Sequence, residues 1–396
     1  MWQKVKNIFH LFIAILANLF FLFPARRLKV IGVTGTDGKT TTVNLIYHIL
    51  RTSGHKSAMV SSISAFIDNK TYDTGSHVTT PAPFTLQKFL RKAARAKSEY
   101  FILEITSHAI DQNRIFGIPI EIGVLTNVTN EHLDYHKTYD KYLKTKVSLL
   151  KKSKISVVNS DDSSYTLLSD AKSKKTQGNW ITYGISESSD YNPKTFDLKD
   201  FNLVGDFNKY NVLAAVSVAK ALGIKEDNIK TAIRTFEMPI GRVDYVYKKD
   251  FSIMIDFAHT PNAFEQLLSA LRPMVKGRII HVFGSAGQRD VLKRPFLGEI
   301  SSLYCDILIL TAEDPRTEDV NKIIAEIEVG IKKEKCEVIR IPDRKEAIEA
   351  AIQMAKKDDL VLITGKAQEG SMNYNKKENP WDEYKVVENA LKAREI

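Results

Sequence analysis

Apolar β-branched runs alternate with amphipathic stretches along the chain from residue 28 onward. Leu28–Thr34 is predicted to form a strand and Thr40–Ser53 a helix, and a later helix over Lys209–Leu222 is predicted to end at Gly223. Further buried strands are predicted at Phe101–Ile105, Ile122–Asn127 and Ile155–Asn159. The polar stretch Ser169–Lys199 is expected to form surface loops and edge strands. Continuous apolar runs between helices are typical of a parallel sheet that is covered on both faces.

A second alternating series begins after Pro239. Its strands are predicted at Phe251–Phe257, Arg278–Phe283, Ile307–Leu310, Glu337–Ile341 and Leu360–Ile363, with helices between them. This pattern indicates a smaller, Rossmann-like α/β unit with its own core. The chain is therefore predicted to be an α/β protein with an apolar arm over residues 1–27, a central parallel-sheet domain over 28–237 and a C-terminal domain over 238–396.

The arm differs from the rest of the chain because 14 of the 16 residues from Ile8 to Phe23 are apolar. As a helix this segment would be about 24 Å long. Its 16 residues are fewer than the roughly 20 that span a bilayer comfortably. Basic residues flank it at Lys4, Lys6, Arg26, Arg27 and Lys29. A secretory signal is disfavoured because no small-residue cleavage site follows. A helix at the membrane interface, a barely spanning helix and a helix docked on the protein's own surface stay open.

Composition narrows the class of protein further. A chain that is 43% hydrophobic and 26% charged can build a packed core. Its net charge of +10 suits anionic partners such as nucleotides or an acidic membrane surface, but the charge is dispersed and no aromatic–basic platform for nucleic acid stands out. Two cysteines, Cys305 and Cys336, exclude a disulfide scaffold and a cysteine-rich metal site, and they favour a reducing, cytoplasmic setting.

The sharpest local signal is a glycine-rich run from Gly32 to Thr42, GVTGTDGKTTT, between a predicted strand and a predicted helix. This is the context of a phosphate-binding loop, in which glycines let backbone N–H groups approach phosphate oxygens at a helix N-terminus. Lys39 would reach the β and γ phosphates, and Thr40 would offer its hydroxyl to Mg²⁺. The spacing departs from the usual P-loop, because the position five before Gly38 is Val33.

The observed form of the loop resembles the variant found in the Mur ligase family, which folylpolyglutamate synthetases share. Thr79, Thr80 and Pro81 resemble the acceptor-binding TTP of MurE-type members. The segment EITSHA, which starts at Glu104 and includes Ser107, is followed by Gln112 and Arg114 and resembles another family motif. The resemblance extends over residues 28 to 394. It implies a P-loop ATPase domain with Gly35, Thr36, Asp37, Gly38, Lys39, Thr40 and Thr41 at ATP, and acceptor contacts from Thr79, Thr80, Pro81, Ser107, Gln112 and Arg114.

The resemblance also implies two Mg²⁺ ions. Glu104 at the end of a strand would suit one of them, since Mg²⁺ prefers oxygen ligands. The segment TNVTNEHLDYH places His132 as a ligand of the second, with Glu131 where the family usually has aspartate. Lys146 follows fourteen residues later, at the spacing of a carbamylated lysine in MurE-like enzymes. A carbamate on Lys146 would turn a cation into an anionic oxygen donor.

Further motifs match the family in the second half of the chain. Asn208 and Asn211 correspond to family residues near the nucleotide base, and Arg242 corresponds to one near the phosphates. Asp256 and His259 match a family segment that touches ribose and adenine. The implied amino-acid pocket consists of Arg289, Asp314, Arg316, Gly365 and Glu369. Two of its motifs depart from the family: EDPR replaces DNPR, and GKAQE replaces GKGHE. These changes leave the amino acid open, although acidic groups beside two arginines suit a diamino acid.

The implied activity is an ATP-dependent amide ligase that adds an amino acid, diaminopimelate or lysine, to a muramyl-peptide precursor of the cell wall through an acyl phosphate. Its catalytic residues would be Lys39, His132, Lys146 and Arg242. The alternatives are a MurT-like or other carboxylate–amine ligase on a lipid-linked precursor, and a P-loop ATPase without ligase activity. Only 27 residues precede the first predicted strand, too few for the UDP-binding domain with which MurE-type enzymes begin. The arm is therefore expected to contact the cytoplasmic face of the membrane or to cover the protein itself.

Overall fold

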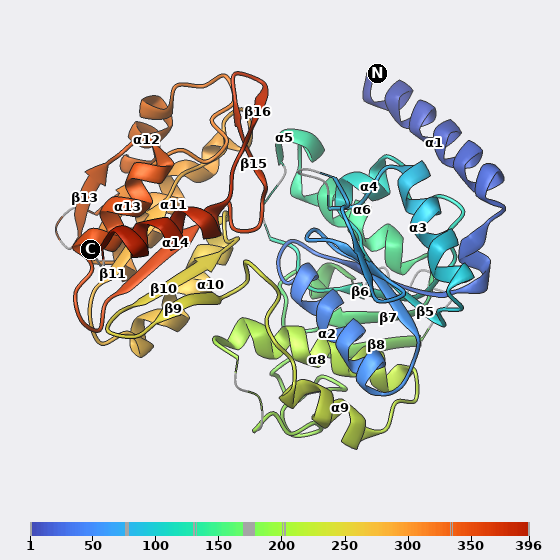
Figure 1. The fold of residues 1–396 in the computed structure, drawn as a ribbon. Coiled ribbons are helices and arrows are strands. Elements are labelled where there is room, and N and C mark those ends of the chain that lie inside the picture. The colour runs from blue at the N-terminus through green and yellow to red at the C-terminus, as the bar shows by residue number, and fades with distance from the viewer. Residues whose placement is uncertain are drawn as a thin grey trace. The chain divides into compact units, whose positions relative to one another are not determined.

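The computed structural model describes residues 2–75, 79–129, 131, 133–168, 179–199, 201, 203–332, 334 and 336–394. Contacts within the chain divide it into two compact units (Figure 1). The N-terminal unit comprises Met1–Leu203 and Phe207–Glu237, and the C-terminal unit comprises Val204–Asp206 and Met238–Ile396. Each unit is built around its own sheet.

The sheet of the N-terminal unit has the strand order β4-β3-β2-β5-β1-β6-β7-β8. These strands are β1 (Lys29–Thr34), β2 (Ser57–Val60), β3 (Ala65–Ile67), β4 (Lys70–Tyr72), β5 (Tyr100–Glu104), β6 (Ile120–Leu125), β7 (Ser153–Asn159) and β8 (Asn179–Tyr183). All neighbours from β2 to β8 pair in parallel, whereas β3 and β4 add an antiparallel edge. Central β1 is flanked by β5 and β6, so the loop after β1 lies where the order of connections reverses, which is where ligands bind in open α/β sheets.

Helices cover both faces of this sheet (Figure 1). They are α2 (Lys39–Thr52), α3 (Pro83–Arg95), α4 (Ser107–Asp111), α5 (Leu133–His136), α6 (Tyr139–Leu150), α8 (Asp206–Ala221) and α9 (Glu226–Arg234). One core forms where apolar residues of α2, α8 and α9 pack on the sheet. A second core forms on the other face, mainly from α3 and the segment that follows α4. The continuous apolar runs in the sequence thus correspond to strands that are buried on both sides.

Helix α1 (Trp2–Phe21) precedes the sheet and lies against α3 on the outside of the N-terminal unit (Figure 1). A short 3-10 turn, η1 (Pro24–Arg27), separates it from β1, so Pro24 does not lead directly into the strand. Leu22 and Phe23 have positive φ angles of 61° and 49°, which turn the chain out of the helix. Among the helices that the structure describes, none is both long enough and apolar enough to cross a membrane.

A buried asparagine attaches α1 to the unit. Asn18 Nδ2 donates to the carbonyls of Ala14 and Phe116, each at 2.8 Å, and Asn18 Oδ1 accepts from Gln87 Nε2 at 3.2 Å. A Cβ on Gly117 would lie 2.7 Å from Asn18 Oδ1, so this glycine lets the two segments approach. The inner face of α1 is therefore held by polar contacts as well as by the buried Ala14 and Ala17.

We expect Asn18→Ala to lower the free energy of unfolding of the N-terminal unit by about 1–3 kcal/mol, because the substitution leaves the buried Gln87 amide without its partner and removes the hydrogen bond to the partly buried Phe116 carbonyl. Chemical denaturation of the two proteins measures this difference. Asn7→Ala serves as the control, because the hydrogen bonds of Asn7, to Asp111 and from Gln3, are partly buried or exposed at the first turns of α1. Equal stability of Asn18→Ala and the unmodified chain would contradict this account of the attachment.

The sheet of the C-terminal unit has the strand order β13-β12-β11-β14-β10-β9, with β9 antiparallel at one edge. Its strands are β9 (Asp244–Lys248), β10 (Ser252–Asp256), β11 (Ile279–Phe283), β12 (Ile307–Leu310), β13 (Glu337–Arg340) and β14 (Leu360–Thr364), and a separate hairpin is formed by β15 (Ser371–Tyr374) and β16 (Lys377–Pro380). Its helical segments are α10 (Pro261–Leu271), η2 (Arg272–Met274), η3 (Val291–Lys293), α11 (Arg294–Tyr304), α12 (Val320–Glu328), α13 (Arg344–Met354) and α14 (Glu383–Arg394). A buried ion pair between Arg344 and Glu383 joins α13 to α14, and Arg344 also donates to the Ala312 and Thr364 carbonyls.

The predicted strands with long apolar runs agree with the observed ones to within about two residues. The predicted edge structure in Ser169–Lys199 is β8, while residues 169–178 lie outside the described part of the chain. The short strands β2, β3, β4, β9, β15 and β16 have no counterpart in the prediction. Several of these are antiparallel edge or hairpin strands of three to five residues, whose pairing depends on the neighbouring strand more than on a local pattern.

Candidate functional site

The glycine-rich loop connects β1 to α2 and ends in the first turn of the helix. Gly35 and Gly38 have φ angles of +154° and +78°. A Cβ on Gly35 would lie 1.7 Å from Thr126 Oγ1, and one on Gly38 would lie 2.3 Å from Asn211 Oδ1. Both positions therefore need glycine for conformation and for space. The open N-terminus of α2 directs backbone N–H groups toward the loop, which is the arrangement that binds phosphate.

Residues after β6 hold this loop in place. The backbone N–H of Thr36 donates to the Asn127 carbonyl, and that of Asp37 donates to Asn127 Oδ1, each at 2.9 Å. The Asp37 carbonyl accepts from Thr126 Oγ1 at 2.7 Å. Lys39 Nζ donates to the Thr36 carbonyl at 2.5 Å, so the lysine lies folded back over the loop. The two segments that sequence motifs assign to ATP and to the metal are thus joined by hydrogen bonds.

Thr40 and Glu104 meet at the carboxyl ends of β1 and β5. Thr40 Oγ1 lies 3.2 and 3.1 Å from the two oxygens of Glu104, and both residues are buried. The backbone N–H of Ser62 donates to Glu104 Oε2 at 2.9 Å, and Ser62 Oγ lies 3.0 Å from Thr40 Oγ1. The sequence reasoning did not single out Ser62, which follows the short strand β2. The result is a compact group of oxygen atoms beside the phosphate loop.

This group fits a magnesium ion. Mg²⁺ in nucleotide sites is held by one or two protein oxygens together with phosphates and water, and the Thr40 hydroxyl and Glu104 carboxylate supply such oxygens. No cluster of three or more histidine, cysteine, aspartate or glutamate side chains suited to a metal occurs among the residues that the structure describes. His132, the predicted ligand of a second Mg²⁺, lies outside those residues.

We expect Glu104→Gln to weaken the apparent affinity for Mg²⁺ by about 10–100-fold, because the amide keeps the shape of the side chain but removes its charge. Titration of Mg²⁺ in the ATP-dependent reaction measures this affinity. Glu99→Gln serves as a control from the opposite end of the same strand, where Glu99 is exposed and contacts Lys29 and His55. An unchanged Mg²⁺ dependence in Glu104→Gln would remove Glu104 from the metal site.

Lys146 on α6 is buried beside the phosphate loop. Only 1% of its surface is exposed, and its Nζ donates to the Gly35 carbonyl at 2.5 Å. The ammonium lies 4.4 Å from the centre of the Tyr142 ring. Burial, and next the charge of nearby Lys39, lower the pKa of Lys146 well below its usual value. A lysine with a lowered pKa more readily provides the neutral amine, the form that reacts with CO₂.

The acceptor motifs form a connected strip at the end of β5. Thr80 Oγ1 donates to the Glu104 carbonyl and accepts from the Thr106 N–H, each at 3.0 Å. Arg114 Nη1 donates to the Thr80 carbonyl at 2.8 Å, while its Nε donates to Gln112 Oε1 at 2.9 Å. The structure therefore brings Thr80, Gln112 and Arg114 next to Glu104. Thr79 and Pro81 flank Thr80 in the chain.

Ser107 belongs to the same strip. Its Oγ lies 3.0 Å from Nε2 of His136, which ends α5. His108 stacks near Tyr135, with ring centroids 4.1 Å apart. His136 was not predicted as a site residue from the sequence, although it belongs to the TNVTNEHLDYH segment. Its contact with Ser107 places it next to the predicted acceptor residues. Consecutive residues of the HLDYH motif thus face residues of the EITSHA motif.

The two predicted base-binding asparagines are neighbours on α8. Asn211 Nδ2 donates to Asn208 Oδ1 at 3.1 Å, and Asn211 Oδ1 accepts from Thr42 Oγ1 at 3.3 Å. Asn211 also faces Gly38, as described above. Both residues are therefore within the N-terminal unit at the phosphate loop, and Thr41 is buried in the first turn of α2.

Arg242, Asp256 and His259 lie close together in the C-terminal unit. Arg242 precedes β9, Asp256 ends β10 and His259 follows β10. Asp256 accepts from the Val243 and Ala258 N–H groups at 2.7 and 2.6 Å, and burial raises the pKa of its carboxyl. The Arg242 guanidinium lies 4.6 Å from the centre of the Phe257 ring. His259 Nδ1 lies 2.9 Å from the Phe257 carbonyl. These three predicted ATP-binding residues are thus one local group.

The predicted amino-acid pocket is also local to the C-terminal unit. Burial, and next repulsion by Arg289, lower the pKa of Arg316, while Asp314 and Glu369 act in the opposite direction. Asp314 and Arg316 have positive φ angles of 45° and 55°, so the EDPR turn is strained. Gly365 has a φ of +103°, and a Cβ there would lie 2.6 Å from Glu313 Oε2. The structure therefore brings all five predicted pocket residues together.

Sequence reasoning missed the cation at the centre of this pocket. Lys366 is fully buried, and its Nζ donates to Asp314 Oδ1 at 3.0 Å and to Glu369 Oε2 at 2.6 Å. Asp314 Oδ1 also accepts from the N–H of Asn373 in β15. The hairpin β15–β16 is thus bound to the EDPR turn through Asp314. The position of Lys366 inside the Gly365–Glu369 motif was the available signal.

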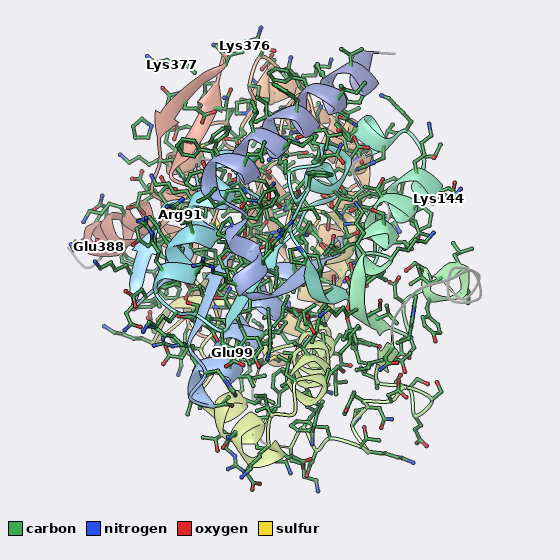
Figure 2. The ribbon with its side chains drawn as sticks, turned by 90° about the vertical axis from the view of Figure 1, so that its right-hand side faces the viewer. Arg91, Glu99, Lys144, Lys376, Lys377 and Glu388 are labelled. Atoms are coloured by element: carbon green, nitrogen blue, oxygen red, sulfur yellow. The ribbon has the colours of Figure 1, made fainter. Side chains whose placement is uncertain are left out.

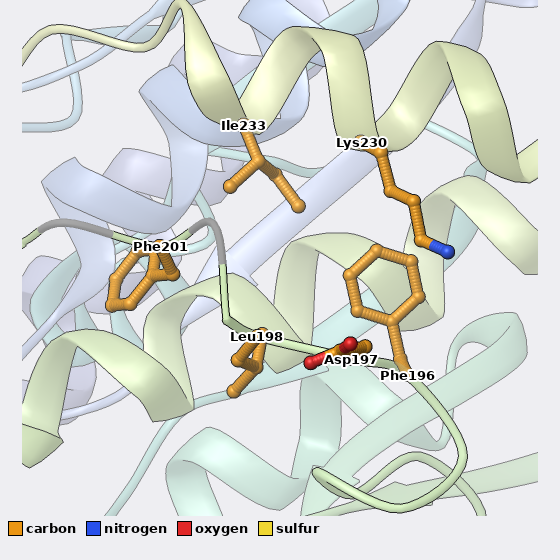
Figure 3. A pocket seen from close by; sticks show the side chains of 6 residues that line it. All are labelled: Phe196, Asp197, Leu198, Phe201, Lys230 and Ile233. Carbon is orange, nitrogen blue, oxygen red and sulfur yellow. The ribbon is translucent and has the colours of Figure 1, made fainter.

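A separate cavity lies in the N-terminal unit between α9 and the segment before α8 (Figure 3). It is small, and it is lined mainly by apolar side chains: Phe196, Asp197, Leu198, Phe201, Lys230 and Ile233. None of the predicted site residues lines it. We assign it no role in the site.

Two protein-family models match this chain, one mainly in the N-terminal unit and one in the C-terminal unit. The family described as Mur ligase middle domain matches residues 33–219, and the family described as Mur ligase, glutamate ligase domain matches residues 241–367. Mur ligase homologues are ATP-dependent acid–amino-acid ligases.

Two curated relatives have the name UDP-N-acetylmuramoyl-L-alanyl-D-glutamate–2,6-diaminopimelate ligase. The one from Clostridium acetobutylicum, numbered 1 in that organism, is 36% identical over 96% of this chain and 81% of its own length. The one from Aquifex aeolicus is 38% identical over 95% of this chain and 80% of its own. A solved structure of the same name is 29% identical with a TM-score of 0.61, over 93% of this chain and 79% of that one. The chain therefore belongs to the Mur ligase family, alongside relatives of the MurE type.

Proposed function

We propose that this chain is an ATP-dependent ligase that joins the amino group of 2,6-diaminopimelate to the terminal carboxylate of a muramoyl-L-alanyl-D-glutamate precursor. The observation that supports this best is the joining of three motifs in the N-terminal unit. Glu104 contacts Thr40 of the phosphate loop through its side chain and Thr80 of the acceptor strip through its backbone. A phosphate donor and a carboxylate acceptor would meet there.

The chemistry requires such a meeting. A carboxylate at neutral pH is a poor electrophile, so one of its oxygens would first attack the γ-phosphorus of ATP, which gives an acyl phosphate and ADP. The amine of the amino acid would then attack the acyl carbon, lose a proton and expel phosphate. Lys39 and the N–H groups at the start of α2 would stabilise the negative charge on the transferring phosphoryl group. The protein contributes mainly positioning and electrostatic stabilisation.

The cofactors we propose are ATP and Mg²⁺, with a carbamate on Lys146. Thr40 and Glu104 would hold one Mg²⁺, which supplies charge neutralisation to the phosphates. The buried amine of Lys146 beside Gly35 supports carbamylation, because burial and Lys39 favour its neutral form. We also propose His132 as a metal ligand on the basis of its motif alone.

The proposed roles follow the two units. Residues 28–237 would bind ATP and the acceptor. For Arg242, Asp256 and His259 of the C-terminal unit we propose a part in nucleotide binding on the basis of their motifs. Residues 238–396 would bind the amino acid, with Arg289 and Arg316 at a carboxylate and the acidic Asp314 and Glu369 near an ammonium. A diamino acid with two carboxylates matches these charges. Because ATP is its substrate, we propose that the enzyme acts in the cytoplasm.

A panel assay tests this function. Purified protein with ATP and Mg²⁺ is mixed with UDP-linked muramyl dipeptide and with diaminopimelate, lysine or ammonia in turn, and products are identified by mass spectrometry. We expect phosphate release that needs both the dipeptide and diaminopimelate, and a tripeptide product. Phosphate release without either substrate would instead indicate an ATPase. An amide product from ammonia would indicate an amidating ligase.

A further inference from the structure

Helix α1 presents a continuous apolar face to solvent. Every exposed residue from Ile8 to Leu22 is apolar, and the set recurs at helical spacing: Ile8, Phe9, Phe12, Ile15, Leu16, Leu19, Phe20 and Leu22. The largest of them are far from buried, with Phe9 62% and Phe20 70% exposed. In Figure 2 this helix crosses the front of the view, with Arg91 of α3 beside it. An apolar stripe of this length is not expected on a surface that meets only water.

The face extends beyond α1. Phe84 at the start of α3 is 41% exposed and contacts the rings of Phe20 and Phe21, with centroids 6.1 and 6.3 Å away. Phe116, whose carbonyl accepts from Asn18, is also exposed. The patch is thus a joint surface of α1, α3 and the segment after α4, rather than one protruding helix.

The charged residues of α1, η1 and α3 have one sign. The sequence has no acidic residue before Asp37, and none from Pro83 to Ser98, the stretch that contains α3. Basic residues in these stretches are partly or fully exposed at Lys6, Arg26, Arg27, Lys88, Arg91 and Arg95. A helix with an apolar face and nearby basic side chains is the physical signature of a segment that lies in the plane of an anionic lipid surface.

The buried contacts on the inner side of α1 are incompatible with a position of this helix across a bilayer. Asn18 is buried and bound to Phe116 and Gln87, and Ala14 and Ala17 are fully buried against the unit. Insertion of α1 across a bilayer would break these contacts and leave Asn18 in hydrocarbon. In-plane contact keeps them, since only the outer face enters the lipid.

We propose that the outer face of α1 docks this protein on an anionic lipid bilayer, parallel to its surface. We take a lipid surface as the occupant because the face consists of aliphatic and phenyl groups and the charged residues of α1, η1 and α3 are all basic. Docking would insert apolar side chains such as Phe9, Phe12 and Leu16 among the acyl chains, and would place Arg26 and Arg27 at the headgroups.

The contacts of α1 connect this surface to the acceptor strip. Gln3 Nε2 donates to Tyr135 Oη at 2.8 Å, Asn7 Nδ2 donates to Asp111 Oδ2 at 2.9 Å, and Tyr135 donates to the same carboxylate oxygen at 2.7 Å. Asp111 ends the helix that begins at Ser107, and Gln112 and Arg114 follow it. This part of the inference rests on the proposed function: the acceptor of a docked enzyme would be a muramyl peptide anchored in the same membrane.

Co-sedimentation with vesicles tests the docking. We expect the full chain to bind vesicles that contain phosphatidylglycerol at least tenfold more tightly than pure phosphatidylcholine vesicles. The pair Phe9→Ser and Phe12→Ser should weaken binding at least tenfold. Its matched control, Leu303→Ser with Val329→Ser, removes two similarly exposed apolar residues of the C-terminal unit, and should bind like the unmodified chain.

A second pair tests the charges. Arg26→Gln with Arg27→Gln should weaken binding roughly tenfold or more, whereas Lys376→Gln with Lys377→Gln, an equal change of net charge in the β15–β16 turn, should not. Failure of the full chain to sediment with either vesicle, or unchanged binding by the phenylalanine pair, overturns the proposal. Dimers in lipid-free solution that the phenylalanine pair converts to monomers would also overturn it, because they would assign the face to protein contact.

Ligation assays separate this inference from the proposed function. With a soluble acceptor, the phenylalanine pair should match the unmodified enzyme; with an acceptor anchored in vesicles, it should be at least tenfold slower. Equal rates on the vesicle acceptor would overturn the inference about the acceptor. Vesicle binding without ligation of any acceptor would overturn the proposed function and leave the docking intact.

Discussion

Replacement of Lys146 by alanine is expected to reduce ligation by roughly a thousandfold or more. The amine is buried beside the Gly35 carbonyl, and the positive charge of Lys39 is close enough to lower its pKa. A permanent ammonium there would repel the other cation and the metal. A carbamate would instead add an anionic oxygen donor next to the phosphate loop, and alanine supplies neither its charge nor its oxygens.

Amino-acid-dependent release of phosphate measures the loss, and added formate or acetate should restore part of the activity of Lys146→Ala by supplying a free carboxylate. Lys144→Ala is the matched control: it lies two residues away on α6, is exposed and pairs only with Asp140 among the contacts described. Thermal unfolding shows whether Lys146→Ala remains folded. A folded variant with full activity would refute the role of Lys146.

A direct readout of the carbamate is available. Protein equilibrated with ¹³C-labelled bicarbonate should show a carbamate carbon signal that Lys146→Ala lacks and that Lys144→Ala retains. This spectroscopic result does not depend on turnover. The same signal in all three proteins would place any carbamate elsewhere.

Replacement of Arg316 by alanine is expected to raise the KM for diaminopimelate by roughly 30-fold to several thousandfold, since loss of a desolvated charged pairing costs about 2–5 kcal/mol. In the structure Arg316 is partly buried and lies near Arg289; burial, and next the charge of Arg289, lower its pKa. A carboxylate of the substrate would relieve the repulsion between the two guanidinium groups. The KM for ATP should not change, because Arg316 is not among the residues proposed to bind ATP.

Steady-state kinetics with each substrate varied in turn measure this difference. Arg340→Ala on β13 is the control, because it removes an exposed arginine of the same unit that pairs with Glu328. A KM for diaminopimelate that stays within twofold would exclude Arg316 from the pocket. A preference of the unmodified enzyme for lysine would exclude diaminopimelate as the amino acid.

The amino-acid sequence by itself determined the parts of this protein that depend on consecutive residues. The run GTDGKT after a strand of β-branched residues forms a phosphate loop because its two glycines adopt positive φ and its lysine and threonine follow at the helix start. The long buried strands were predictable for a similar reason, since each contains a local run of mainly apolar residues. Family motifs then predicted which residues would contact the acceptor and the amino acid.

Other features were decided by the tertiary structure alone. The sequence placed Lys146 at a suggestive spacing, but only the packing of α6 on the phosphate loop buries its amine and lowers its pKa. Lys366 pairs with Asp314, 52 residues away, so this contact depends on tertiary packing that brings the end of β14 next to the turn after β12. The strands β2, β3 and β4 are too short to be stable without their neighbours.

The apolar segment near the N-terminus shows the distinction best. Its composition determined that Ile8–Phe23 would form an apolar helix or arm, and left membrane contact and self-coverage equally open. The structure answers which residues face which way: Ala14, Ala17 and Asn18 face the unit, while Phe9, Phe12 and Phe20 face outward. The number of apolar residues does not determine which of them are exposed, because exposure depends on which side of the helix packs against α3. The small residues Ala14 and Ala17 and the hydrogen-bonded Asn18 determine that side.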